Sequence, residues 1–365
     1  MKIGILTFHF AHNYGAVLQA FALQKYLIEK GHDVEIINHV PPSMKNGYKM
    51  TMWRECISLK HPFRSIYKLY VESHLYRLRK LRWKRFNSFI NKNLILSNGQ
   101  VVDSKYDAYI VGSDQVWNTK ITKGFYGPYF CRFSFNKDNR LYISYAASME
   151  ANSLNEVQKR TYKEYLKSFD YISVRESAFV SLLQPLTTKQ IYQTIDPTLL
   201  VNRDFWDKMT ICPNVGKKYI LLYRVWGNEA RLITNKMSAE YSLDVIELVS
   251  WLDYKTHKNK YQAASPIDFI SLFKYADFVV TDSFHGTAFS IIFNKNFYFV
   301  KTNDSQSRSE SLLMSLGLQN RIINGKELLN YKLNNIDYTN VMNKLELLKK
   351  NSVNFLDLAL GTDTY

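Results

Sequence analysis

Residues 279–292 read Val279-Val280-Thr281-Asp282-Ser283-Phe284-His285-Gly286-Thr287-Ala288-Phe289-Ser290-Ile291-Ile292. The stretch begins with an apolar, β-branched run, which predicts a short buried strand. Polar residues and a glycine interrupt the run, and the small apolar residues after them favour a helix. A strand that passes directly into a helix places the turn between them at the carboxyl end of a parallel sheet, where open α/β folds bind ligands. The stretch therefore predicts an α/β fold with a ligand site at this turn.

The turn at 282–286 combines several features of an anion-binding site. A helix start presents free backbone N–H groups and the positive end of a dipole, and Gly286 lets a ligand approach the backbone closely. Asp282 and His285 add titratable side chains. The alternative is that Asp282 only caps the helix and that His285 is an ordinary loop histidine at the surface. One strand–turn–helix unit does not decide between the two interpretations.

Composition limits the class of protein. A length of 365 residues with 46% hydrophobic residues predicts two domains with a sizeable core. Cys56, Cys131 and Cys212 are far apart and form no CxxC pair, which predicts neither disulfides nor a metal site and fits the reducing cytoplasm. The start MKIGILTFHF reads as a strand rather than a signal peptide, and no stretch resembles a membrane span. We therefore expect a cytoplasmic protein.

The charge of the chain predicts an anionic partner. The net charge is +16 and the pI is about 9.4. Residues 60–92 contain many Lys and Arg side chains, with Glu72 as the single acid, and aromatic and aliphatic residues are interleaved among them. Such a basic amphipathic segment is suited to an anionic membrane surface. The alternative is a solvated basic helix that packs on its domain. The chain has no recognisable nucleic-acid module, so we expect no nucleic-acid partner.

The pattern of elements divides the chain into two α/β halves. A strand over 2–8, a helix ending at Gly31 and a strand over 33–38 form a βαβ unit without the G-x-G-x-x-G motif, so no dinucleotide site is predicted. A second series of strands and helices restarts near residue 218. We expect residues 194–200 to link the halves and the helical tail to cross back to the first. The predicted divisions are 1–200, 201–335 and 336–365.

Polar turns follow other predicted strands as well. An apolar run ends in Gly-Ser-Asp114-Gln115, a second strand ends at Arg175-Glu176, and a third ends at Lys301. Arg175 offers a planar, always-charged fork that suits a carboxylate or phosphate. The alternative for Arg175 is a buried structural pair with a Glu or Asp.

The ordered set of turns resembles the polysaccharide pyruvyl transferase family over roughly residues 1–330. The resemblance rests on six motifs in order, which are Asn13-x-Gly15-Ala16-x-Leu18-Gln19, Val111-Gly112-Ser113-Asp114-Gln115-Val116-Trp117-Asn118, Ser173-Val174-Arg175-Glu176, Asp196-Pro197-Thr198, Asp282-Ser283-Phe284-His285-Gly286 and Ser307-Arg308-x-x-x-Leu312-Leu313. It implies two Rossmann-like domains that face a central cleft, as in GT-B glycosyltransferases. The basic helical segment 60–92 is an insertion in the first domain, outside the shared motifs.

The resemblance also implies a reaction. Family members transfer the pyruvyl group of phosphoenolpyruvate to two hydroxyls of one sugar, forming a cyclic ketal and releasing phosphate. The donor would lie on the side of the second domain and the acceptor on the side of the first. The acceptor would be a saccharide on a polyprenyl diphosphate carrier, a precursor of a bacterial surface polysaccharide such as a capsule, met at the inner face of the cytoplasmic membrane. Phosphoenolpyruvate is a substrate, and neither a cofactor nor a metal is expected.

Roles for individual residues follow from this chemistry as hypotheses. His285 would bind phosphate and protonate it as it leaves. Asp114 or Asp282 would act as base or would orient a sugar hydroxyl, and Glu176 would be the carbon acid or would orient Arg175. The expected donor-binding residues are Arg175, Ser283, His285, Gly286, Lys301 and Arg308. The expected acceptor-binding residues are Asn13, Gly15, Gln19, Asp114, Gln115 and Trp117. The alternative for Asn13 and Gln19 is that they hold the first turn.

Two other functions remain open at the level of sequence. One is a GT-B-type glycosyltransferase that uses a nucleotide sugar, because the same cleft and cations would suit a diphosphate. The other is a basic binding protein without catalytic activity that attaches to acidic glycans or membrane. Preference for phosphoenolpyruvate over nucleotide sugars distinguishes a pyruvyl transferase from a glycosyltransferase. Release of phosphate from donor and sugar distinguishes a pyruvyl transferase from the binding protein.

Overall fold

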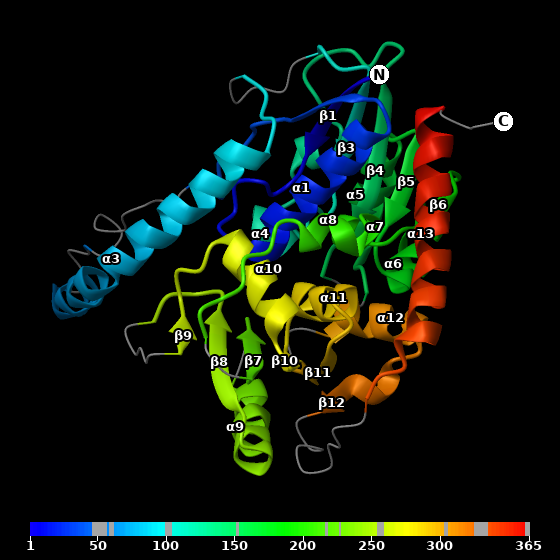
Figure 1. Cartoon of the computed structure of the whole chain (residues 1–365). Coiled ribbons are helices and arrows are strands. Elements are labelled where there is room, and N and C mark those ends of the chain that lie inside the picture. The colour runs from blue at the N-terminus through cyan, green and yellow to red at the C-terminus, as the bar shows by residue number, and fades with distance from the viewer. Residues whose placement is uncertain are drawn as a thin grey trace.

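Two six-stranded parallel sheets form the framework of the chain (Figure 1). The computed structural model describes residues 1–45, 57, 62–98, 104–150, 153–215, 218–225, 228–253, 259–302, 306–324 and 335–361. The central strands of each sheet are short, apolar and buried, as the continuous hydrophobic runs predict. The α/β class expected from the sequence is confirmed.

The first sheet has the strand order β2-β1-β3-β4-β5-β6. Its strands are β1 (Lys2–Leu6), β2 (Asp33–Ile36), β3 (Ala108–Val111), β4 (Leu141–Ala147), β5 (Tyr171–Val174) and β6 (Ile191–Gln193). The helices of this half are α1 (Tyr14–Glu29), α3 (Pro62–Asn93), α4 (Thr119–Thr122), α5 (Glu156–Leu166) and α6 (Ser177–Leu183), with short 3-10 turns η1 (Gly127–Phe130) and η2 (Gln184–Leu186).

The second sheet has the order β12-β11-β10-β7-β8-β9. Its strands are β7 (Tyr219–Arg224), β8 (Asp244–Val249), β9 (Lys260–Tyr261), β10 (Phe278–Thr281), β11 (Asn296–Lys301) and β12 (Ile322–Asn324). Its helices are α9 (Glu229–Tyr241), α10 (Pro266–Tyr275), α11 (Phe284–Ile292) and α12 (Gln306–Leu316), with the turn η3 (Gln319–Arg321). The strand–turn–helix predicted at 279–292 is therefore β10 followed by α11.

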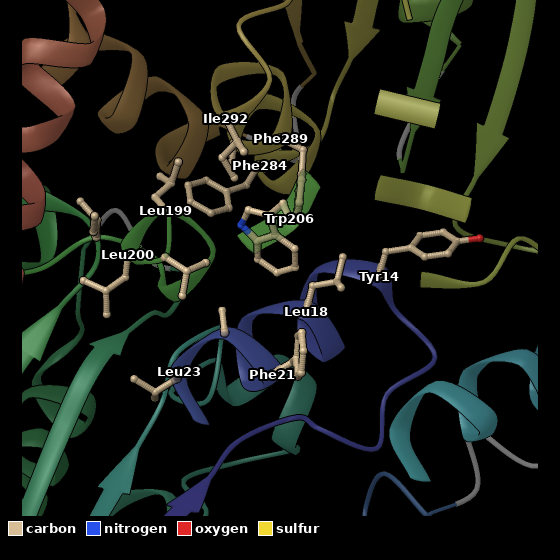
Figure 2. Packing of buried hydrophobic residues seen from close by; sticks show 14 of the residues in the cluster. Tyr14, Leu18, Phe21, Leu23, Leu199, Leu200, Trp206, Phe284, Phe289 and Ile292 are labelled. Carbon is tan, nitrogen blue, oxygen red and sulfur yellow. The ribbon is translucent and has the colours of Figure 1, made fainter. Parts of the chain in front are cut away.

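The two halves share one apolar core, which includes side chains of α1 and α11 (Figure 2). Side chains of α10 belong to the same core. The connection between the halves contains α7 (Pro197–Leu200) and α8 (Arg203–Asp207). Trp206 of α8 lies between Phe21 of α1 and Phe289 of α11, with ring centroids 6.3 and 5.1 Å away. The Tyr14 ring stacks on Phe269 at 4.8 Å. Such a large apolar interface holds the two sheets in a fixed relation.

The last helix, α13 (Tyr338–Leu360), runs along the first sheet (Figure 1). The backbone N–H of Ile195 donates to Ser352 Oγ at 2.9 Å, and the Phe355 ring lies 5.2 Å from that of Tyr192. The chain that leaves the second sheet therefore returns to the first.

Helix α3 is a single element of 32 residues with two unlike halves. Its second half packs into the core through Phe86, Phe89 and Ile90, as the packed-helix alternative predicts. From the same half, the Arg82 guanidinium donates to the carbonyls of His12 (2.9 Å) and Gln262 (3.1 Å), one in each half of the chain. The first half of α3 projects away from both sheets (Figure 1). Residues 60 and 61 of the predicted segment lie outside the described residues.

None of the described helices combines the length and the apolarity needed to cross a bilayer.

His12 makes the stability of this interface depend on pH. Burial, and next the charge of Arg82, lower the pKa of His12 to about 4 from its usual 6.5. Between these two values the unfolded chain binds a proton at His12 that the folded chain does not, so stability falls as the pH falls through this window. The expected contribution is about 3 kcal/mol. In urea titrations from pH 7 to 4, His12→Gln should lose less stability than wild type.

The control for this variant is His74→Gln, which removes an exposed imidazole from α3. An equal loss of stability in wild type and His12→Gln would contradict the assignment.

Candidate functional site

A cavity of about 270 Å³ lies between the carboxyl ends of the two sheets. Side chains from both halves line it. From the first half they are Phe8, Ala11, Asn13, Ala16, Met44, Asp114, Gln115, Asn118, Ile121 and Glu150. From the second half they are Val225, Asp282, Ser283, Phe284, His285 and Arg308. The site is therefore where parallel sheets bind ligands.

The β10–α11 turn is held by its own polar side chains. Ser283, not Asp282, is the N-cap of α11, and its hydroxyl accepts from Gly286 N at 3.5 Å. The Asp282 carboxylate instead accepts from Val225 N at 2.6 Å, which ties the turn to the end of β7. A Cβ on Gly286 would lie 2.2 Å from Thr281 Oγ1. Gly286 thus lets α11 start close against β10 and does not line the cavity.

His285 is buried against the first half of the chain. Its side chain is 8% exposed, and Nε2 lies 3.6 Å from Asp196 Oδ2. The alternative of an ordinary surface histidine is therefore wrong. A Cβ on Gly15 would lie 1.9 Å from His285 Nδ1, so the missing side chain of Gly15 provides the space for the imidazole. The sequence predicts that Gly15 binds the acceptor, whereas in the structure Gly15 makes room for His285.

A buried ion network lies behind His285. Arg175 Nη1 donates to Asp196 Oδ2 at 2.7 Å and Arg175 Nε donates to Glu176 Oε1 at 3.0 Å. Ser148 Oγ also donates to Glu176 Oε1, at 3.0 Å. Thr198 donates to Asp196 Oδ1 through its backbone N–H and its hydroxyl. The structural-pair alternative for Arg175 therefore describes its contacts, and Glu176 orients Arg175 without lining the cavity.

Charge and burial act in opposite directions on these carboxyls. Burial alone would raise the pKa of Asp196, but His285, Arg175 and the Thr198 N–H together hold that pKa below its usual value. Burial raises the pKa of Glu176, against the charge of Arg175. Asp196 is therefore held as an anion by its partners. The sequence placed Asp196 in a link between domains and gave it no role in the site.

The Arg175 guanidinium also lies over the Phe284 ring, 4.2 Å from its centroid. Phe284 thus stands between Arg175 and much of the larger cavity. A smaller cavity of about 90 Å³ on the other side is lined in part by Arg175, Asp196, Phe284 and Arg308. Within the described residues, Arg175 Nη2 is buried without a hydrogen-bond partner.

Asp114 faces the donor-side residues from the first half. Its backbone is left-handed, with φ 73°, and carbonyl O accepts from Val116 N and Ser148 N at 2.8 and 2.9 Å. No hydrogen bond to its carboxylate is found in the part of the chain that the structure describes. Beside it, the amide oxygen of Gln115, when turned toward Arg308, accepts from Nη1 and Nη2 at 2.6 and 2.7 Å. Burial and Arg175 lower the pKa of Arg308, which remains a cation.

Asn13 caps α1, and Oδ1 accepts from Ala16 N at 3.3 Å, at the edge of the cavity. Three other predicted site residues do not line the cavity. Gln19 is buried and donates to Thr7 Oγ1 and Ala16 O. Trp117 donates to Tyr129 O and stacks on Phe130 in the core. Lys301 forms an ion pair with Glu310 at 2.6 Å. Each is committed to a neighbour within its own half of the chain.

The structure adds residues that the sequence analysis missed. Asn118 and Glu150 line the cavity, and Asn118 Nδ2 donates to Glu150 Oε2 at 3.1 Å. Phe284 and Asp196 were quoted only as parts of motifs. Asn118 also stood in a quoted motif, whereas Glu150 follows β4 without any motif, so no sequence signal identified it. Among the described residues, no three His, Cys, Asp or Glu side chains converge as metal ligands.

The contact between Gly15 and His285 gives a double-mutant test. Gly15→Ala should destabilise the protein by about 1–3 kcal/mol, because the new methyl group must displace the imidazole. In a His285→Ala background the same change should cost little or should stabilise, since alanine favours a helix over glycine by about 0.5–1 kcal/mol. Urea unfolding of the four proteins measures the coupling.

Gly127→Ala is the matched control, because its Cβ would meet Arg132 O at 3.4 Å, an ordinary contact. If Gly15→Ala costs as much without the imidazole as with it, Gly15 is not what makes room for His285.

Comparison with known proteins identifies the fold and the family. The chain resembles S. aureus MnaA in a co-structure with UDP (TM-score 0.54, 12% identity, 100% of this chain and 98% of that one). It also resembles a UDP-N-acetylglucosamine 2-epimerase (TM-score 0.50, 11% identity, 100% and 97%). At such identities the similarity shows the fold alone, which is GT-B-like. No curated protein sequence matches the chain.

The family model for polysaccharide pyruvyl transferase matches residues 13–305, which confirms the resemblance drawn from the motifs. The family implies a transferase of polysaccharide biosynthesis with a saccharide acceptor. The chain belongs to the polysaccharide pyruvyl transferase family.

Proposed function

We propose that this transferase moves the pyruvyl group of phosphoenolpyruvate onto two hydroxyls of one sugar, forming a cyclic ketal and releasing phosphate. The acceptor is a precursor of a bacterial surface polysaccharide, carried on a polyprenyl diphosphate lipid and modified on the cytoplasmic side. The observation that carries the proposal is the pairing of groups across one small cavity. His285 and Arg308 come from the second half, and the Asp114 carboxylate comes from the first.

The donor lies against the second half. Phosphoenolpyruvate carries a phosphate and a carboxylate, and both need cations or N–H donors. Arg308 supplies a guanidinium and α11 supplies its amino-terminal dipole. The Asp196 carboxylate lies beside His285 and balances the charge of a protonated ring. His285 can therefore hold the donor phosphate and give it a proton as it leaves.

The acceptor lies against the first half, where Asp114 is the base. Asp282 is less suited to this role because its carboxylate already accepts from Val225 N. Glu176 is less suited to act as the carbon acid because it is buried behind Arg175. Asn13 remains at the cavity wall as a hydrogen-bonding group for the sugar, while Gln115 beside Asp114 binds Arg308.

The protons of the reaction balance when two sugar hydroxyls react with one phosphoenolpyruvate. Protonation of the methylene carbon makes C2 electrophilic, and the first hydroxyl adds there and loses its proton. Phosphate then leaves with a proton as the C2–O bond breaks, and the second hydroxyl adds to C2 and loses its proton. Two protons are released from the sugar, one reaches carbon and one leaves with phosphate. A base near the hydroxyls and an acid near the phosphate are needed, which matches Asp114 and His285.

The size of the cavity favours a small donor. Sites for small ligands usually span about 300–1,000 Å³, and this cavity of about 270 Å³ is below that range. A cavity of this size suits phosphoenolpyruvate together with one sugar ring better than it suits the nucleotide sugar that a GT-B glycosyltransferase binds.

Thermal unfolding with candidate donors tests the proposal. Phosphoenolpyruvate should raise the melting temperature, whereas UDP-, GDP- and CMP-sugars should not. A ligand at a hundred times its Kd stabilises the folded state by about 2.7 kcal/mol. His285→Ala should lose this stabilisation and the release of phosphate in the presence of donor and sugar.

Stabilisation by a nucleotide sugar alone would identify a glycosyltransferase instead. Full turnover by His285→Ala would refute the role of the imidazole. Lys301→Gln is the matched control, since Lys301 is a cation of the same half that pairs with Glu310 away from the cavity.

Asp114→Asn separates catalysis from donor binding. Asparagine tolerates the left-handed backbone at this position but cannot accept a proton. Phosphate release should fall by about 10²–10⁴-fold, while stabilisation by phosphoenolpyruvate persists. Steady-state phosphate release and melting curves measure the two effects.

Glu150→Gln is the control, because Glu150 lines the same cavity but already accepts from Asn118. An Asp114→Asn enzyme that keeps wild-type turnover, or a Glu150→Gln enzyme that loses as much, would exclude Asp114 as the base.

A further inference from the structure

The first half of α3 exposes an apolar stripe that no described element covers. Phe63, Ile66, Tyr67 and Tyr70 have exposed fractions of 87%, 65%, 59% and 60%. Their spacing of i, i+3, i+4 and i+7 puts them on one face of the helix. This end of the helix points away from both sheets (Figure 1). Four large exposed side chains in one row differ from the isolated exposed apolar residues that any surface carries.

Two exposed cations lie beside the stripe, and the rest of α3 is also basic. The helix carries nine Lys or Arg side chains and one acid, Glu72. That acid is buried and binds Arg79 through two bonds of 2.9 and 2.7 Å, so it does not offset the exposed charge. Arg64 and Lys68 are exposed on the flank of the stripe, and Arg77 continues its line along the helix.

We propose that this stripe docks on a bilayer surface that contains anionic lipids. Helices that lie in such surfaces combine aromatic and aliphatic side chains with Lys and Arg, because the former enter the headgroup boundary and the latter bind lipid phosphates. A second copy of the chain is a poorer occupant, since it would bring like charges together. A nucleic acid would satisfy the cations but would leave Phe63 and Ile66 without an apolar partner.

The other half of α3 transmits the orientation of this contact to the active site. Arg82 joins α3 to carbonyls on both halves of the chain, and Phe86 and Phe89 are buried in the core. A docked stripe would therefore hold the cavity in a fixed orientation relative to the membrane. The docking itself does not depend on the proposed reaction. Only the benefit of docking for a lipid-linked acceptor rests on the proposed function.

Vesicle co-sedimentation tests the docking. The wild-type chain should bind phosphatidylcholine vesicles that contain phosphatidylglycerol, should bind neutral vesicles weakly, and should lose binding at high salt. Phe63→Ser with Ile66→Ser should weaken partitioning by about tenfold or more. Arg64→Gln with Lys68→Gln and Arg77→Gln should weaken it by about fivefold for each cation removed.

Matched variants control for changes in surface and charge. Val157→Ser with Leu232→Ser removes exposed apolar side chains (72% and 60%) from α5 and α9. Lys163→Gln with Lys208→Gln and Lys350→Gln removes the same number of exposed charges elsewhere. Both control proteins should bind vesicles as wild type does.

Three results would overturn the proposal. The first is equal binding of the wild-type chain to neutral and anionic vesicles. The second is an equal loss of vesicle binding in stripe and control variants. The third is a stripe variant that keeps vesicle binding and changes only self-association or RNA binding in sedimentation experiments. Phosphate release with phosphoenolpyruvate and a soluble sugar is measured in parallel. Stripe variants should keep that activity, so a failure of docking and a failure of the proposed reaction are distinguishable.

Discussion

The burial of the Asp196 carboxylate between Arg175 and His285 is the interaction on which the site depends. Arg175 follows β5, Asp196 precedes α7, and His285 belongs to α11 of the other half. A buried charge is tolerated only when it is paired and hydrogen-bonded, and removal of one partner typically costs about 3–5 kcal/mol. This requirement links the two sheets electrostatically at the point where the cavity forms.

The apolar interface explains why such a network can be maintained. Trp206 packs between aromatic side chains of α1 and α11, and Tyr14 stacks on Phe269 of α10. These contacts fix the distance between the sheets, so that Gly15 can leave room for the imidazole without leaving a gap. Apolar packing thus sets the position of the two halves, and the ion network uses that position to orient His285.

The sequence predicted the α/β fold and the polar turns at strand ends because these depend on local patterns. Hydrophobic runs, glycines and helix starts identified β10, α11 and the residues around Asp114. It could not predict which polar side chains reach the cavity, because that depends on packing between distant segments. Gln19 and Trp117 stand in the right motifs but point into the core. The role of Asp196 in the site could not be predicted, because its partners Arg175 and His285 come from distant segments of the chain.

The distribution of charge separates two functions that composition alone cannot distinguish. A net charge of +16 predicts an anionic partner, and substrates with phosphate groups are one explanation. The cavity, however, is lined by the carboxylates of Asp114, Glu150 and Asp282 as well as by His285 and Arg308. Its lining therefore does not account for the excess of cations. Nine Lys or Arg residues lie instead on α3, against a single acid. Half of the net charge of the chain thus lies on α3. The site instead balances its cations with carboxylates, as a reaction that moves protons between donor and acceptor requires.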